Sequence, residues 1–96
     1  MTWTEHHSKS ERLVGEAEAA ARRGESTEAV TLYRQAAEAE LTALSDLDPT
    51  KVRTLGITAV SAVALLYKAH LYLQAQRIAH SWLSTDKLPS FAVDQL

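Results

Sequence analysis

A run of thirteen apolar or small residues, Leu55–Tyr67, constrains the fold of this chain most strongly. A membrane-spanning helix needs about 20 such residues, so this segment is too short to cross a bilayer. A helix that is apolar nearly all round is instead covered by protein on several faces. The segment therefore predicts a central helix, and the rest of the chain must supply the helices that cover it.

Good helix formers dominate the remaining sequence, and the few helix breakers are placed where turns are needed. Gly24 suits a left-handed helix stop, and Pro49 ends one helix and suits the first position of the next. Ser8 or Ser10, Ser26 and Asp48 are candidate N-caps. The expected helices cover residues 10–23, 26–47, 49–69, 72–83 and 89–96, with an earlier start of the first helix near Thr4 left open.

These elements predict an all-α fold of antiparallel helical hairpins, with four long helices and a short C-terminal helix. Ninety-six residues fit one domain. Its first hairpin is expected over about 10–47 and its second over about 49–83, followed by the short helix at 89–96. Short turns between the long helices make sequence neighbours antiparallel.

The first predicted hairpin carries a family resemblance. Its second helix has Glu28-Ala29-Val30, an aromatic residue at Tyr33 and a further alanine at Ala36, all following the turn at Gly24. This pattern resembles the second half of a tetratricopeptide repeat. A second, longer unit is similar around His70, which takes the place of the turn glycine 46 residues after Gly24. The same Glu28–Ala36 segment also resembles the microtubule-interacting and transport domain, although the apolar residues 55–67 depart from that family.

The tetratricopeptide resemblance implies right-handed stacking of the hairpins and a concave face that binds a peptide or helix of a partner protein. By position, this resemblance implies that the groove includes charged residues that can select a partner. The expected groove residues are Glu11, Glu18, Arg22, Tyr67 and Lys68. The resemblance also implies groove positions for Ile57, Val60 and Ala64, with burial in the core as the alternative.

Catalytic, metal and cofactor signatures are not found in the sequence. There is no cysteine, and no His-Glu-x-x-His or glycine-rich phosphate-binding motif. His6 and His7 are expected in a frayed N-terminus, and Glu38 and Glu40 are expected on different faces of one helix. We therefore expect no enzyme, no catalytic or metal-binding residues and no cofactor.

Charge is divided unevenly between the two halves of the chain. Residues 1–50 carry five basic and ten acidic side chains, a net charge of −5, and residues 51–96 carry five basic and two acidic ones, a net charge of +3. This division allows one half of the chain to attract the other, or one molecule to attract the next. A homodimer is a further expectation, because two hairpins are short for a repeat solenoid and can leave residues 55–67 partly uncovered. A nucleic-acid-associated or regulatory role of the basic half is the alternative, although dispersed basic residues argue against nucleic acid. With no secretory signal or membrane segment in view, the expected location is the cytoplasm.

Overall fold

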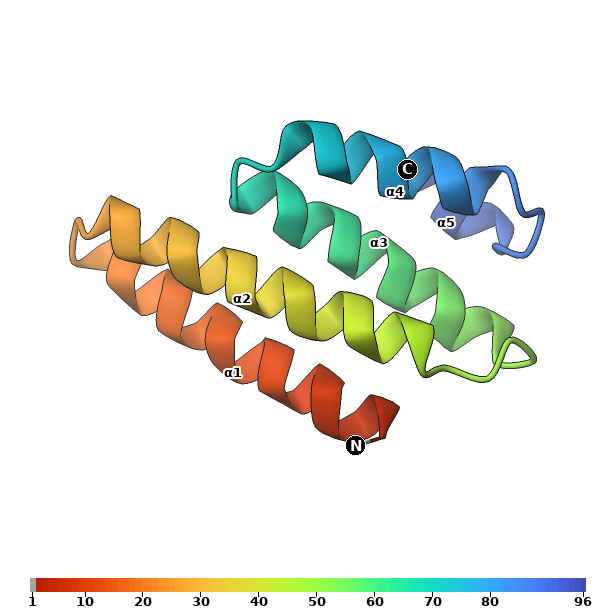
Figure 1. The fold of residues 1–96 in the computed structure, drawn as a ribbon, viewed down its shortest axis with the longest axis horizontal. Coiled ribbons are helices and arrows are strands. Elements are labelled where there is room, and N and C mark those ends of the chain that lie inside the picture. Colours follow the sequence, from red (N-terminus) through yellow and green to blue (C-terminus); the bar gives the residue numbers. More distant parts are fainter. Residues whose placement is uncertain (1) are drawn as a thin grey trace.

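Five α-helices form residues 2–96, the part of the chain that the computed structural model describes (Figure 1). Two antiparallel hairpins lie side by side, and the short last helix folds back against the third one. No strand occurs among the described residues, so the expected all-α architecture of four long helices and a short one is confirmed. The helices are α1 (Trp3–Arg22), α2 (Ser26–Ser45), α3 (Val52–Lys68), α4 (Tyr72–Leu83) and α5 (Ser90–Gln95).

Helix α1 begins two turns earlier than the expected start at Ser10. Thr2 is its N-cap, and the Thr2 hydroxyl accepts a hydrogen bond from the backbone N–H of Glu5 at 3.3 Å. The roles of Ser8 and Ser10 as caps are therefore wrong. Ser10 lies in the middle of the helix, where it is buried and donates a hydrogen bond to the carbonyl oxygen of Ala36 at 2.9 Å. This bond ties α1 to α2.

The two long hairpins turn in the same way. Gly24 and His70 both adopt left-handed backbone conformations, with φ of 78° and 62°. In each turn the next N–H reaches five residues back, from Glu25 to Ala20 and from Leu71 to Leu66, at 2.9 Å in both cases. The expected equivalence of Gly24 and His70 as helix stops is confirmed.

The expected caps of α2 and α3 are wrong. Neither helix has a side-chain N-cap hydrogen bond, and the capping positions are Glu25 and Lys51. The carboxylate of Asp48 instead accepts two hydrogen bonds from Thr50, one from the backbone N–H and one from the hydroxyl, both at 2.9 Å. This turn places Pro49 in the loop, and α3 starts only at Val52.

Small residues bring the helices close together at the core. Alanines with no exposed surface lie on every helix, and Leu66 of α3 is the largest apolar side chain that is almost fully buried. Because alanine side chains are short, the helix backbones can approach closely where they meet. The larger core cluster consists of Leu13, Ala36, Ala37, Val63, Leu65, Leu66, Ala75 and Ala79.

Helix α5 packs closely against the N-terminal part of α3 at Gly56. A Cβ atom added to Gly56 would lie 2.8 Å from both Cδ and Cγ of Pro89 and 3.2 Å from the Cβ of Ala92. The sequence pattern predicts an inner face of this helix formed by Phe91, Ala92 and Leu96. Ala92 is fully buried and Leu96 packs against the larger core cluster, as predicted, whereas Phe91 is 38% exposed, so its assignment is wrong. Among residues 2–96, no helix combines the length and the apolar character that crossing a membrane requires.

Candidate partner-binding site

One side of α3 remains exposed although its residues are mostly apolar. Ile57 and Tyr67 are 47% and 44% exposed, Ala64 is exposed, and Val60 is half-buried. These four residues are three or four positions apart, so they form one stripe on the helix surface. We call them the α3 stripe. The helices expected to cover this segment therefore leave one side of it open.

Two hollows flank the α3 stripe. The first, of about 320 Å³, lies between α1 and α3 and is lined by His7, Ser10, Glu11, Val14, Glu40, Ser61, Ala64, Leu65 and Lys68. The second, of about 420 Å³, lies between α3, α4 and the C-terminal residues Gln95 and Leu96. Ala64 lines both hollows, so the two lie on either side of the middle of the stripe.

The five residues expected in the groove are only partly brought together. Glu11 and Lys68 line the first hollow from opposite helices, and Tyr67 lines the second. Glu18 and Arg22 are exposed further along α1, and they line neither of these hollows.

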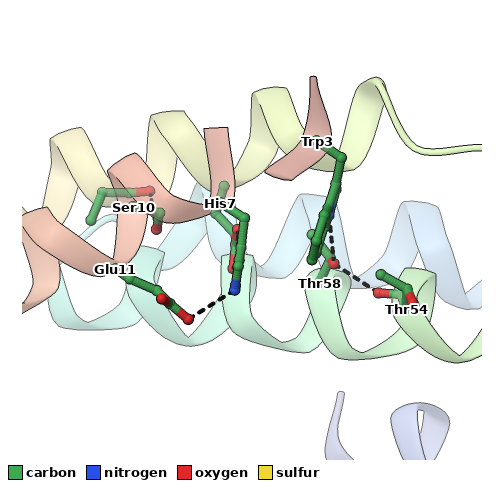
Figure 2. A network of polar contacts seen from close by, with 8 residues as sticks. Trp3, His7, Ser10, Glu11, Thr54 and Thr58 are labelled. Atoms are coloured by element: carbon green, nitrogen blue, oxygen red, sulfur yellow. Dashed lines mark hydrogen bonds and ion pairs between the residues drawn. The ribbon is translucent and has the colours of Figure 1, made fainter. Parts of the chain in front are cut away.

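His7 organises the wall of the first hollow. Its Nδ1 lies 2.9 Å from Oε1 of Glu40 on α2. Its Nε2 lies 2.9 Å from Oε1 of Glu11, one helical turn away (Figure 2). The Glu40 side chain is 1% exposed, whereas that of Glu11 is 69% exposed. Only a protonated imidazole donates hydrogen bonds from both ring nitrogens, so the arrangement fits a cationic His7 between two carboxylates.

The pKa of His7 is raised above its ordinary value. Burial is the largest single influence and opposes the charged ring, but the hydrogen bonds and negative charges of Glu40 and Glu11 together outweigh it. The cationic ring compensates the buried carboxylate of Glu40, which would otherwise be costly to remove from water.

Trp3 completes this network and connects it to α3. Its ring stacks on that of His7, with centroids 4.7 Å apart and planes inclined by 9°. The indole N–H donates to the hydroxyl of Thr58 at 3.2 Å, and that hydroxyl donates to the carbonyl oxygen of Thr54 at 2.7 Å (Figure 2). The first turns of α1 are thereby attached to both neighbouring helices.

The expected frayed N-terminus is wrong, because His7 belongs to a capped helix. Glu38 and Glu40 do lie on different faces of α2, since Glu38 is exposed and Glu40 is buried as the partner of His7. The sequence does contain a local signal for the burial of Glu40. It follows Ala37 by three residues and precedes Leu44 by four, so it shares a helix face with two buried apolar residues. Its partner lies 33 residues away, so sequence spacing could not identify the pair.

Replacing Trp3 with phenylalanine tests the link to α3. The ring can still stack on His7, but the hydrogen bond to Thr58 is lost, so we expect the free energy of unfolding to fall by about 1 kcal/mol. Urea denaturation measures this change. The double variant Trp3→Phe/Thr58→Val should lose less stability than the sum of the losses in Trp3→Phe and Thr58→Val, because both single variants remove the same hydrogen bond. Full additivity would contradict the link.

No three histidine, aspartate or glutamate side chains in the described part of the chain are grouped so that they could hold a metal ion. Glu11 and Glu40 approach opposite nitrogens of the His7 ring, so the three groups share no common point for a metal.

No protein-family model, curated protein or solved structure matches this chain. The resemblances to the tetratricopeptide repeat and to the microtubule-interacting and transport domain therefore stay expectations.

Proposed function

We propose that the protein is an interaction module that binds a segment of a partner protein along the α3 stripe. The observation that carries this proposal is the exposure of Ile57 and Tyr67 on a helix whose other sides form the core. An exposed apolar patch of this kind, bordered by polar groups, is typical of a binding surface. The hollows on both sides of Ala64 provide room for side chains of the partner.

The borders of the stripe support the same function. Glu11 and Lys68 stand on opposite walls of the first hollow, and Gln76 and His80 line the second. Apolar contact in the middle with polar groups at the rim is the usual construction of a protein interface. A second copy of the chain is one partner that such a surface can bind, and the experiment below separates this case from a different protein.

Replacing Ala64 with arginine tests the proposal. The position is exposed and lines both hollows, so the long charged side chain should obstruct the hollows without disturbing the core. We expect binding of the partner to fall by at least about tenfold, equivalent to about 1.4 kcal/mol. Affinity capture from cells followed by quantitative mass spectrometry measures the loss, and sedimentation velocity of the pure protein detects a homodimer.

The matched control is Thr31→Arg, at an exposed position on α2 away from both hollows. This variant adds the same side chain and should retain the same bound proteins as the wild type. If Ala64→Arg captures every protein that the wild type and the control capture, and the oligomeric state is unchanged, the proposed binding surface is wrong.

A further inference from the structure

We propose that the bound segment is an amphipathic helix with acidic side chains beside its apolar residues. This inference rests on the function proposed above, since it specifies the partner that the α3 stripe accepts. Three features of the molecule support it, namely the length of the stripe, the backbone chemistry of its walls and the distribution of charge around it.

The length of the stripe matches a short helix. Ten residues separate Ile57 from Tyr67, which at about 1.5 Å per residue gives about 15 Å, or three helical turns. A partner helix of about 11 residues can lie along this distance, with apolar side chains at helical spacing directed at the stripe. The hollows on both sides of Ala64 can then accept the largest of these side chains.

The walls of the two hollows favour a helix over an extended segment. They come from α1, α2, α3, α4 and the end of α5, whose helical backbone groups are already hydrogen-bonded within each helix. An extended peptide needs external partners for its own N–H and C=O groups. A helix satisfies these groups internally, so it can contact an apolar surface without leaving backbone N–H and C=O groups unpaired.

The charges near the stripe favour an acidic partner. Residues 51–85 contain four basic residues, Lys51, Arg53, Lys68 and Arg77, and no aspartate or glutamate. Arg53 precedes Ile57 by one turn and Lys68 follows Ala64 by one turn, so exposed basic side chains lie near both ends of the stripe. Acidic side chains on a bound helix can approach both of them.

Acidic groups of the protein limit where the partner's charges can lie. Glu11 lines the first hollow, but its carboxylate is already paired with the His7 ring, and Glu18 lies further along α1. Asp94 is exposed on α5. The acidic side chains of the partner should therefore face Arg53, Lys68 and the α4 side, away from the carboxylates of α1.

Peptide display tests this inference without a known partner. A library of random peptides of about 16 residues is selected on the immobilised full chain, with Ala64→Arg as the counter-selection bait. We expect the enriched peptides to be net negative, with apolar residues at i, i+3 or i+4, and i+7. A synthetic enriched peptide should become helical on binding, as measured by circular dichroism.

Charge reversal provides the second readout. The double variant Arg53→Glu/Lys68→Glu should bind the enriched peptide about tenfold more weakly, because two favourable charge contacts become repulsive. Raising the salt concentration should reduce the difference, since rim charges are screened. The matched control, Arg34→Glu/Lys87→Glu, changes the net charge equally at exposed positions outside both hollows and should bind normally.

The outcomes separate the two proposals. Enriched peptides that are basic, or that lack helical spacing of apolar residues, would overturn the acidic-helix inference and leave the binding surface standing. Equal binding of the enriched peptide by the charge-reversed variant and the wild type would overturn the acidic-helix inference as well. Selection of the same peptides by the wild type and by Ala64→Arg would overturn the proposed function itself.

Discussion

Replacing Gly56 with alanine should weaken the attachment of α5 to α3, even though this substitution ordinarily strengthens a helix. The added Cβ would lie 2.8 Å from two ring atoms of Pro89, and a proline ring cannot rotate away as a flexible side chain can. Overpacking of this kind costs about 1–3 kcal/mol. The gain in helix propensity on replacing glycine is about 1 kcal/mol, so the net effect should be destabilising.

Gly15 provides the matched control, because it is also a helical glycine but lies in an open environment. A Cβ atom added there would have no atom within 4 Å. Gly15→Ala should therefore raise the free energy of unfolding by about 1 kcal/mol. The difference between the two variants isolates the packing cost at Gly56 from the general effect of removing a glycine.

Hydrogen exchange locates the change within the chain. In Gly56→Ala, amide groups of Ser90–Gln95 should exchange faster, while those of α1 and α2 remain protected. Chemical denaturation of both variants gives the free energies. Equal stabilisation by Gly15→Ala and Gly56→Ala, with unchanged exchange in α5, would contradict the close packing of α5 on Gly56.

Much of the fold can be predicted because its signals are local. The position of Gly24 after a helical pattern predicts the stop of the first helix, and its left-handed backbone agrees. The predicted boundaries of α4, Tyr72 and Leu83, are also correct. Such features depend on residues within one or two turns, which spacing and turn chemistry describe well.

The helix starts are harder to predict, because several polar residues can cap each one. For α1, Ser8, Ser10 and Thr2 all have suitable hydroxyl groups. Thr2 is the cap, and beside it the side chains of Trp3 and His7 bond to Thr58 of α3 and Glu40 of α2. Tertiary contacts therefore support a boundary that local propensity leaves open.

The candidate site is only partly predictable for the same reason. The family resemblance implies groove positions for Tyr67, Lys68 and Glu11, which line the two hollows, but also for Glu18 and Arg22, which line neither. It implies a groove position for Ile57 as well, whereas the apolar character of residues 55–67 indicates burial. Ile57 is 47% exposed, and periodicity alone could not decide between these alternatives, because nearly every side of this helix is apolar.

Replacing His7 with phenylalanine should produce the largest loss of stability among the substitutions considered. The aromatic ring can still stack on Trp3, but the carboxylate of Glu40, 1% exposed, loses its cationic partner. Removing one member of a buried charge pair typically costs about 3–5 kcal/mol, and the partial exposure of His7 places the expected loss at about 3 kcal/mol. Denaturation in urea or guanidinium chloride measures it.

The double variant His7→Phe/Glu40→Leu distinguishes loss of the pair from loss of packing. Removing both charges eliminates the buried carboxylate, so the double variant should be more stable than His7→Phe by about 2 kcal/mol or more. A double variant as unstable as the sum of the two single variants would show that the charges of His7 and Glu40 do not compensate each other.

The pH dependence of stability provides the remaining test of this pair. Because the pKa of His7 is higher in the folded state than its ordinary value of about 6.5, folding favours the protonated ring. The resulting stabilisation is fully present below about pH 6.5 and is lost as the pH rises through the folded-state pKa. The wild type should therefore lose stability over this interval relative to His7→Phe/Glu40→Leu, whereas the exposed control His80→Gln should follow the wild type. Parallel profiles for the wild type and the double variant would mean that a protonated His7 does not bridge the carboxylates of Glu40 on α2 and Glu11 in the first hollow.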